Sequence, residues 1–571
     1  MRFLRARGSG DPSGDSSATE PAGAAALPST PSDDDLDLGT AASMAAVEGL
    51  AIGDPVLASA IESEIERLDE PEGQESLGSE IKRGAAWSSL SSVALRLGTF
   101  VMGIVAARLI APDEFGVFTV ALTVHAIILN VSEIGVGAYL VRHTGSPDKV
   151  APTVLTISLT TSAVLAGLMF LTAPYLATSL GSADAAGPIR VLSITVLLAG
   201  PSAVPNALLV RSFRQDKLFL SQILSFVSSN GMLVVLAIAG SGAYALAWSR
   251  VAGHLVQTIA LLLLAGRIFL PGFDRALFPK LLKFGLPLAG FSLLGFATGN
   301  IDFVVIGREL GSEELGLFSL AYNVSSWGFG FISPVVAAVA MPAFARVRHD
   351  RERMPAFLRT GLQTVLCLAL PVSAMTVALS GPLVESIYGD KWLGAASALA
   401  VTAIYGALRV PSDLFISTGI AFGRTKALFL IQIVYFVALI PLMLYGVGAD
   451  GIVGASWAHA VGIVLTLLPG LFWMIRSATG TSISSLLVAT LPPLGAACAA
   501  GAVAYLISSA LHGPWLRLIA GGLGGMAVYF AVLGPWAYRA FPRARELWRD
   551  GDRPAADVGD VPTMIPSVPS D

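Results

Sequence analysis

Apolar residues run along this chain in long blocks, and each block is long enough to cross a lipid bilayer as a helix. The hydrocarbon core of a bilayer needs about 20 helical residues. Between Arg83 and Arg539 the blocks lie near residues 85–109, 115–141, 152–178, 189–211, 218–240, 243–268, 284–307, 314–345, 356–380, 393–421, 427–447, 451–475, 484–508 and 515–538. The pattern predicts an all-α polytopic membrane protein with about 14 transmembrane helices.

The second half of this region repeats the first. Arg108–Val124 aligns without gaps on Arg308–Val324, and six of the 17 positions are identical. Leu218–Val227 and Leu428–Val437 agree at seven of ten positions. Further matches follow in the same order, pairing Pro174 with Pro382, Gly181 with Gly389, and Trp248 with Trp457. The duplication therefore covers whole lobes, and membrane carriers built from repeats place their substrate between them.

This repeat divides the chain into parts. We expect an N-terminal six-helix lobe over 84–270, a pseudo-symmetric C-terminal six-helix lobe over 280–476, and two additional transmembrane helices over 484–538. Residues 1–80 are rich in Gly, Ser, Pro and Asp, and residues 540–571 are rich in Pro and Asp. Such segments bury too little apolar surface to fold, so both are predicted to be disordered tails.

Composition supports a membrane protein, and the distribution of charge orients it. The chain is 54% apolar and 13% charged, with a mean hydropathy of +0.71. With fourteen spans, 24 basic residues lie on the side of the termini, and five lie on the other side: Arg108, Arg190, Arg308, Lys391 and Arg517. Basic residues mark the cytoplasmic side. We therefore expect a multi-pass protein of the cell inner membrane with both termini in the cytoplasm.

The connections between the spans exclude several functions. The outer loops are too short for an external catalytic domain, and the chain has no G-x-x-x-x-G-K-[ST] motif of a P-loop ATPase. Its two cysteines, Cys367 and Cys498, lie in apolar spans and suit neither a disulfide framework nor a metal site. The sequence predicts neither an enzyme nor a nucleic-acid-binding protein, and it predicts no cofactor. A carrier or a membrane-embedded binding protein remains.

Three segments carry a resemblance to a known family. Arg108–Gly116 (RLIAPDEFG) combines a basic residue, a small-residue turn, an acidic pair and Phe-Gly, and Arg308–Gly316 (RELGSEELG) echoes it in the second lobe. Lys280–Pro287 (KLLKFGLP) leads into the seventh span. Together these segments resemble the polysaccharide-transporter (oligosaccharide flippase) branch of the MOP flippase superfamily, and the resemblance covers about 85–540.

The resemblance implies a MOP flippase-like fold, in which two six-helix lobes form a V-shaped cavity that opens to each side alternately. The implied function is to flip a polyprenyl-diphosphate-linked oligosaccharide from the cytoplasmic to the outer leaflet, for cell-surface polysaccharide biosynthesis. The implied partners are this lipid-linked glycan, the lipid bilayer, and a glycan polymerase or export machinery. Alternatives in the superfamily are a peptidoglycan lipid-precursor flippase and a drug/cation antiporter. An alternative of another class is a membrane scaffold for glycan-synthesis enzymes.

Three arginines, Arg96, Arg250 and Arg409, fall within predicted spans. A charge at the bilayer centre costs about 2.5–3.5 kcal/mol or more unless it faces water or a partner. The three are therefore candidate cavity residues that bind the diphosphate, since the arginine fork suits phosphate oxygens.

Three carboxylates are candidate partners of these arginines. Glu133 either forms a structural salt bridge with Arg96 or tunes it as a ligand in the cavity. Asp413 follows Arg409 by one helical turn, and this pair either neutralises itself or opens toward the substrate. Asp302 lies at a depth similar to Arg250 in the opposite lobe, so a contact between them would form an outer gate. Lone polar residues in the spans, including His125, Asn230 and Asn300, are predicted to hydrogen-bond between helices.

Overall fold

The computed structural model describes residues 95–132, 139–141, 146–267, 269–275, 277–347 and 353–551, which belong to one compact unit. All regular secondary structure in these residues is helical. Backbone N–H and C=O groups in hydrocarbon find no water, and a helix satisfies them within its own segment. The predicted all-α fold is confirmed for the described part of the chain.

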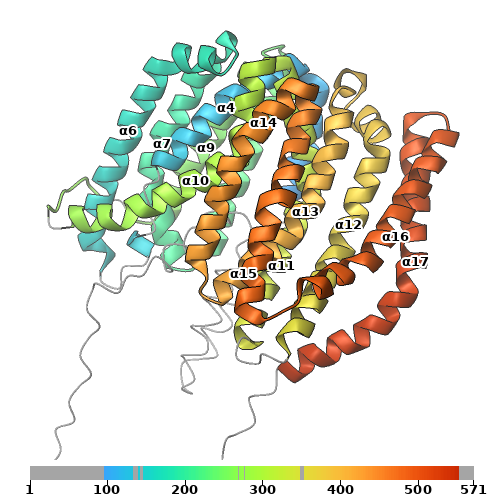
Figure 1. Cartoon of the computed structure of the whole chain (residues 1–571). Helices are drawn as coiled ribbons and strands as arrows, with labels where there is room; N and C mark the ends of the chain where they lie inside the picture. Colours follow the sequence, from blue (N-terminus) through green and yellow to red (C-terminus); the bar gives the residue numbers. More distant parts are fainter. Residues whose placement is uncertain are drawn as a thin grey trace, which may run out of the picture. The chain divides into compact units, whose positions relative to one another are not determined.

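The N-terminal lobe is a group of helices in which neighbours along the chain pack together. Contacts join α6 to α7, α8 to α9, and α7 to α9. Figure 1 shows α6, α7 and α9 at one edge of the bundle. The helices of this lobe are residues 95–109, α4 (Pro112–Ser132), α6 (Pro147–Ser179), the short η1 (Ala183–Ala185), α7 (Ala186–Arg211), α8 (Gln215–Ile238) and α9 (Ala243–Ala265).

The C-terminal lobe repeats this order, and its longest helix is broken in the middle. Within α14 the backbone leaves the helical region at Asp450 and Gly451, where Gly451 has φ +53°. A turn of π-helix, η3, then joins the end of α14 to α15. The helices are α10 (Phe278–Leu310), α11 (Ser312–Val347), α12 (Met354–Ile387), η2 (Asp390–Trp392), α13 (Ala395–Ala421), α14 (Thr425–Gly462), η3 (Ile463–Leu467) and α15 (Leu468–Thr479).

Two further helices, α16 (Ile483–Ala510) and α17 (Pro514–Gly551), pack on each other and on α12. They lie at the opposite edge of the bundle from α6 in Figure 1. The predicted span ended at residue 538, and 540–571 were expected to be a disordered tail, but α17 continues to Gly551. The prediction is wrong for 540–551 because these residues include Ala, Arg, Glu and Leu, which extend an existing helix readily.

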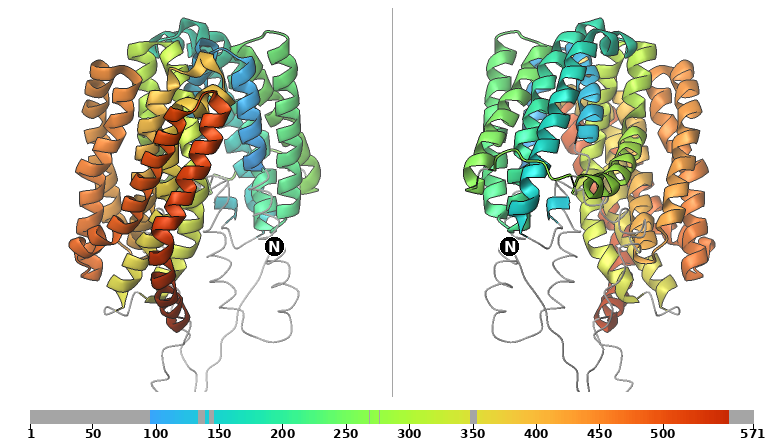
Figure 2. Two further views of the ribbon diagram at one scale, coloured as in Figure 1. Left: turned by 90° about the vertical axis from the view of Figure 1, so that its right-hand side faces the viewer. Right: turned by 90° about the vertical axis from the view of Figure 1, so that its left-hand side faces the viewer.

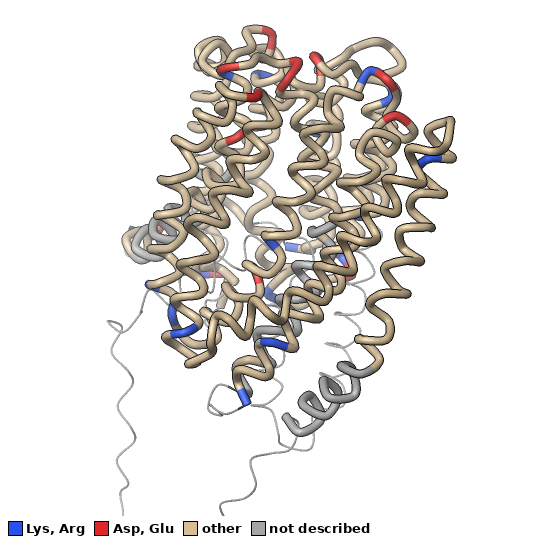
Figure 3. Tube along the Cα trace, turned by 45° about the vertical axis from the view of Figure 1, so that its right-hand side comes forward, with Lys and Arg blue, Asp and Glu red and all other residues tan. Residues whose placement is uncertain are grey.

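The described helices account for the predicted number of spans. Ten segments are long and apolar enough to cross a membrane, with Thr425–Thr479 counted as one. The break at Asp450 and Gly451 divides that segment into two, and residues 95–109, α10 and α11 complete the set of about fourteen. Both views in Figure 2 show most of the helices running between the same two ends of the bundle. Figure 3 shows most Lys and Arg toward one end and most Asp and Glu toward the other.

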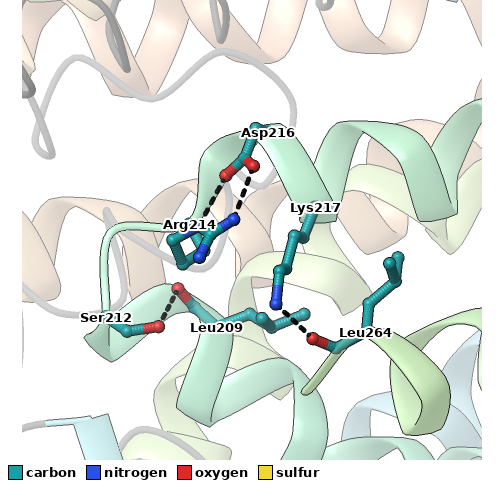
Figure 4. A network of polar contacts seen from close by, with 6 residues as sticks. All are labelled: Leu209, Ser212, Arg214, Asp216, Lys217 and Leu264. Atoms are coloured by element: carbon teal, nitrogen blue, oxygen red, sulfur yellow. Dashed lines mark hydrogen bonds and ion pairs between the residues drawn. The ribbon is translucent and has the colours of Figure 1, made fainter. Parts of the chain in front are cut away.

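The turns between α7 and α8 and between α13 and α14 match each other across the repeat. Phe213 has φ +51°, and Gly423, its counterpart in the second lobe, has φ +66°. After the first turn, Arg214 forms an ion pair of 2.9 Å with Asp216, and Lys217 donates to the carbonyl of Leu264 at 2.7 Å (Figure 4). The Lys217 bond satisfies a free carbonyl at the end of α9 and ties α8 to it.

The two lobes meet where α4 packs on α11. A Cβ atom at Gly116 would clash with the carbonyl oxygen of Ser312, and one at Gly316 would clash with the carbonyl oxygen of Pro112. One turn further along, Thr119 donates to Ser319 at 3.3 Å. Each of these positions faces its own duplicate region, so the repeat corresponds to a pseudo-two-fold arrangement of the lobes. The glycine that ends each copy of the repeated motif is the residue that this contact requires.

We expect Gly116→Val to separate the lobes at this point, because any added side chain meets backbone that cannot rotate away. In a Cys367→Ser, Cys498→Ser background, Thr119→Cys and Ser319→Cys should form an oxidative cross-link, and Gly116→Val should reduce its yield severalfold. Gly167→Val on α6 is a matched control, since Gly167 has open space around its Cβ position. Undiminished cross-linking in the Gly116→Val protein would contradict this account of the contact.

Candidate functional site

Arg96 reaches from the first helix of the N-terminal lobe to the C-terminal lobe. Its guanidinium donates to the carbonyl of Gly330 in α11. Nearby, the rings of Phe100 and Trp327 lie 4.7 Å apart and join the same two helices. Arg96 is therefore at the contact between the lobes, whereas its predicted partner Glu133 lies outside the described residues.

Arg250 belongs to a polar group inside the N-terminal lobe. Its guanidinium carbon lies 5.8 Å from the centre of the Phe118 ring on α4. The Phe118 ring is buried, whereas the Arg250 residue is exposed. It interacts electrostatically with His125 and His254. The imidazole Nε2 of His125 and the hydroxyl of Thr195 are 2.7 Å apart, which joins α4 to α7.

The predicted hydrogen bonds between helices are only partly confirmed. His125 makes such a bond with Thr195. Asn230 and Asn300 instead donate to carbonyls one turn back in their own helices, at 2.7 Å and 2.9 Å. An amide four residues after a carbonyl can reach it without any partner helix, and the sequence pattern does not distinguish these two cases.

The structure places Asp302 beside His459, and the predicted gate between Arg250 and Asp302 stays a prediction. Asp302 is completely buried in α10, and its Oδ2 lies 3.5 Å from Nε2 of His459 in α14. His459 corresponds to Arg250 in the repeat, by the same offset that pairs Trp248 with Trp457. The carboxylate therefore lies beside the counterpart of Arg250 within its own lobe, because α10 packs on α14.

Arg409 lies in α13 beside aromatic hydroxyls as well as its predicted carboxylate. Its Nη1 donates to the hydroxyl of Tyr405 at 3.4 Å. It also interacts with Asp413 and with Tyr322 on α11, and it is partly exposed. Asp413, the predicted partner, is one of several groups that act on Arg409, and the tyrosines were not anticipated. Tyr405 lies one turn before Arg409 on the same helix face, which could have indicated it from the sequence, whereas Tyr322 belongs to α11 and gave no such signal.

All three arginines in the spans thus contact the two central helices. Arg96 and Arg409 contact α11, and Arg250 contacts α4. These are the helices that meet at the pseudo-two-fold axis. The three arginines therefore lie on both sides of the contact between the lobes.

A set of hydrogen bonds to backbone carbonyls joins the two lobes at the end of the bundle where α4 begins. Arg108 donates to the carbonyls of Ile387, at 2.8 Å, and of Ser386. In the reverse direction, Lys391 donates to Ile110 at 2.7 Å, and the completely buried Trp392 donates to Ala107 at 2.8 Å. We call these four residues, Arg108, Lys391, Trp392 and Ile387, the interlobe clasp.

The duplicated glycines make room for this clasp. Gly389, with φ +97°, lies against the guanidinium of Arg108, and Gly181, with φ +84°, lies against the backbone of Gly307 and Arg308. The sequence showed Gly181 and Gly389 as a repeated pair and Arg108 and Arg308 as another. Only the structure shows that each glycine meets the arginine segment of the opposite lobe.

Within the described ranges, no group of three or more His, Cys, Asp or Glu side chains is arranged to hold a metal ion. The polar groups described above are arginines, imidazoles and tyrosine hydroxyls, together with the carboxylates of Asp302 and Asp413. Such groups bind anions or exchange protons.

Comparison with known proteins places this arrangement in a family. Residues 105–397, slightly more than half of the chain, match the family described as polysaccharide biosynthesis protein. The chain is 29% identical over 468 residues to the succinoglycan biosynthesis transport protein ExoT of Rhizobium meliloti (strain 1021), which covers 79% of this chain and 92% of that protein. It is 23% identical over 438 residues to the lipopolysaccharide biosynthesis protein WzxC of Escherichia coli (strain K12), covering 75% and 88% respectively.

Solved structures share the fold at lower sequence identity. The lipid II flippase MurJ in an inward closed conformation superposes with a TM-score of 0.65 at 15% identity, covering 79% of this chain and 100% of that one. An inward-facing multidrug resistance MATE family transporter of the MOP superfamily gives a TM-score of 0.55 at 17% identity, covering 68% and 96%. The predicted MOP flippase-like fold is confirmed.

The family match begins within residues 95–109 of the first helix and ends in α13. It therefore includes α4, α11, the repeated motif and the whole interlobe clasp. This chain, a multi-pass membrane protein, belongs to the polysaccharide biosynthesis protein family.

Proposed function

We propose that this chain is a flippase that moves a polyprenyl-diphosphate-linked oligosaccharide from the cytoplasmic to the outer leaflet. It acts by alternating access, as one step of cell-surface polysaccharide biosynthesis. The observation that carries this proposal is the contact of all three intramembrane arginines with the two central helices. An anionic headgroup moving between the lobes passes these arginines, while its lipid tail stays in the bilayer.

The chemistry of such a cargo explains why charged arginines lie within the membrane-spanning segments. A diphosphate with attached sugars cannot enter hydrocarbon without losing its hydration, which is strongly unfavourable. Guanidinium groups replace part of that hydration with paired hydrogen bonds and stay charged when poorly solvated. The membrane potential, negative inside, favours outward movement of an anion by about 2.3 kcal/mol per charge per 100 mV.

The names of the relatives support this class of cargo. ExoT is a transport protein of succinoglycan biosynthesis, and WzxC belongs to the biosynthesis of lipopolysaccharide. The protein therefore binds a lipid-linked glycan and the lipid bilayer, and it works beside a glycan polymerase or export machinery in the cell inner membrane. It acts as a carrier and catalyses no covalent step.

We also propose that the interlobe clasp faces the outside of the cell and that both termini lie in the cytoplasm. Arg108 and Lys391 belong to the side with five basic residues, and the opposite side has 24. In the conformation described here the lobes are joined at the outer end. Release of the cargo outward then requires the clasp hydrogen bonds to break, and Arg108, Lys391 and Trp392 exchange protein carbonyls for water at that step.

Labelling in intact cells tests the orientation. In the Cys367→Ser, Cys498→Ser background, a membrane-impermeant thiol reagent should label Asp184→Cys and leave Lys426→Cys unlabelled until the cells are permeabilised. Both positions are exposed, so a difference in labelling reports sidedness and not burial. Labelling of Lys426→Cys alone would reverse the orientation.

Deletion tests the cargo. The lipid-linked glycan should accumulate in the cytoplasmic leaflet while its synthesis continues, and peptidoglycan synthesis should proceed normally. Unchanged surface glycan in a strain without a paralogue would contradict a flippase of polysaccharide precursors. Loss of peptidoglycan precursor export instead would indicate the related lipid-precursor flippase.

Substitution tests the site. Arg96→Ala and Arg409→Ala should each reduce flipping by at least about tenfold, the effect of losing one charged hydrogen bond of about 1.5–3 kcal/mol, and Arg→Lys should retain part of the activity. Arg190→Ala is a matched control, since Arg190 is an exposed arginine whose guanidinium lies over Phe170 of α6. If Arg96 only forms a structural salt bridge with Glu133, a different result is expected. If Glu133→Gln fully restores flipping to the Arg96→Ala protein, Arg96 is not a ligand of the diphosphate.

A further inference from the structure

The interlobe clasp contains two cations whose hydrogen-bond acceptors are all neutral. Nε of Arg108 donates to the carbonyl of Ile387 at 2.8 Å, and its Nη2 donates to the carbonyl of Ser386. Nζ of Lys391 donates to the carbonyls of Ile110 at 2.7 Å and of Arg108 at 3.1 Å. Among the described residues, neither cation forms an ion pair with a carboxylate.

The two cations are close together and open to solvent. Lys391 bonds to the backbone of Arg108 itself, both residues are exposed, and they act on each other electrostatically. Glu114 is a carboxylate that acts on Lys391, but it lies against Gly242 at the start of α9. Like charges held near one another repel, and an anion placed between them relieves that repulsion. The positive charge of the clasp is therefore left to be neutralised.

Joining the lobes at this end does not require a charged donor. Trp392 makes the same kind of contact from its indole N–H to the carbonyl of Ala107 at 2.8 Å, and it is uncharged. The acceptors belong to helix ends, where the last carbonyls are free and any N–H group can satisfy them. The charges of Arg108 and Lys391 therefore need an explanation beyond the clasp itself.

The other side of the pseudo-two-fold contact closes without such cations. There Gly181 packs directly on the backbone of the second lobe. Arg308, the counterpart of the clasp arginine, is exposed and makes no hydrogen bond or ion pair within the described ranges. By the offset that pairs Gly181 with Gly389, the position corresponding to Lys391 is Ala183. The repeat supplies a contact between the lobes on both sides, and the pair of cations is an addition to one of them.

The clasp hydrogen bonds and a bound phosphate group exclude each other. A guanidinium binds a phosphate best through two parallel N–H groups on one edge. In Arg108 the edge formed by Nε and Nη2 is occupied by carbonyls of α12, and Nη1 lies beside the Cβ position of Gly389. A phosphate group can therefore use the fork of Arg108 only after the lobes have separated at this end.

We propose that Arg108 and Lys391 form a diphosphate-binding site that becomes available when the clasp opens. This inference rests on the proposed function, which makes this end the outer one and the cargo a diphosphate. Arg108 follows Arg96 by twelve residues of the same helix, so it lies about 18 Å further outward at 1.5 Å per residue. Water reaches both cations as the clasp opens, and the diphosphate replaces part of that water with charged hydrogen bonds from one residue of each lobe.

The consequence is an outer end whose closure depends on the cargo. The same N–H groups serve either the carbonyls or the phosphate, so a bound headgroup stabilises the open conformation by its higher affinity for it. When the glycan lipid leaves, the cations return to the carbonyls and the lobes close. Linkage is reciprocal, so a protein with a weakened clasp should bind the diphosphate more tightly at this site.

Distances between the lobes test this inference in the purified full-length protein in lipid nanodiscs. In the same cysteine-free background, spin labels at Asp184→Cys in η1 and Asp450→Cys at the break in α14 report the separation of the lobes, since both positions are exposed. Saturating farnesyl diphosphate should raise the ratio of open to closed molecules about tenfold, the order expected for one hydrogen bond to a charged group. Arg108→Gln and Lys391→Gln should each abolish this response.

Two control variants separate the loss of charge from the loss of a contact. Trp392→Phe removes a clasp hydrogen bond and no charge, so it should raise the open population without ligand and keep the response to farnesyl diphosphate. Arg308→Gln removes an arginine at the corresponding place of the second lobe, and it should leave the response unchanged. Lys391→Arg should keep the response that Lys391→Gln loses, and this pair gives the same comparison if Arg108→Gln does not fold.

Inorganic pyrophosphate distinguishes two sources of the diphosphate group. If pyrophosphate produces the same shift as farnesyl diphosphate, the site accepts the group from water. If only farnesyl diphosphate produces the shift, the site accepts the group from a lipid. Either shift supports the site, provided that Lys391→Gln removes it.

The outcomes distinguish this inference from the proposed function. Lobe distances that farnesyl diphosphate does not change overturn the inference, and so does an equal loss of response in Lys391→Gln and Trp392→Phe. The flippase proposal stands in both cases if calorimetry shows farnesyl diphosphate binding that Arg96→Ala weakens. A shift that depends on Lys391, with calorimetric binding unaffected by Arg96→Ala, supports the outer site and overturns Arg96 as a ligand of the diphosphate.

Discussion

The contact between the N-terminal ends of α4 and α11 is the constraint on which the arrangement of the lobes depends. At Gly116 and Gly316 the backbones are so close that no side chain fits. Small residues allow this approach in a membrane, where helices gain nothing from burying apolar surface that lipid already covers. Thr119 and Ser319 then add a hydrogen bond between the lobes one turn later. The duplicated motif is therefore a structural requirement of two lobes that meet at their own repeats.

The two lobes share one arrangement of helices, but the polar side chains inside them differ. The N-terminal lobe has the cationic Arg250 with His125, and the C-terminal lobe has His459 with the carboxylate of Asp302 at the corresponding place. A transporter whose lobes had the same charge would present the same surface to both sides of its cargo. Here one lobe has a cationic side chain at this place, and the other has an imidazole beside a carboxylate.

The two additional helices pack on the C-terminal lobe through α12. Glycines of α17 lie against α16 and α12, with the Cβ position of Gly525 close to Met375 and the carbonyl of Ala500. The hydroxyl of Tyr529 donates to the backbone carbonyl of Cys367 at 2.8 Å. These contacts let α16 and α17 move with α12 during any change in the lobe contact.

The sequence by itself determined the helical class, the number of spans and the duplication, because bilayer thickness converts apolar length directly into helices. It also identified Arg96, Arg250 and Arg409, since a charge in an apolar run needs no structure to be noticed. The sequence predicted that Asp302 lies opposite Arg250, because the depth of a residue in a span can be counted along the helix. The direction in which its side chain faces cannot be read in this way. Only the tertiary structure decided that Asp302 lies beside His459, that Lys391 and Trp392 close one end of the lobe contact, and that α17 extends to Gly551. These facts depend on which helices are neighbours, and a linear pattern of apolar and polar residues does not contain that information.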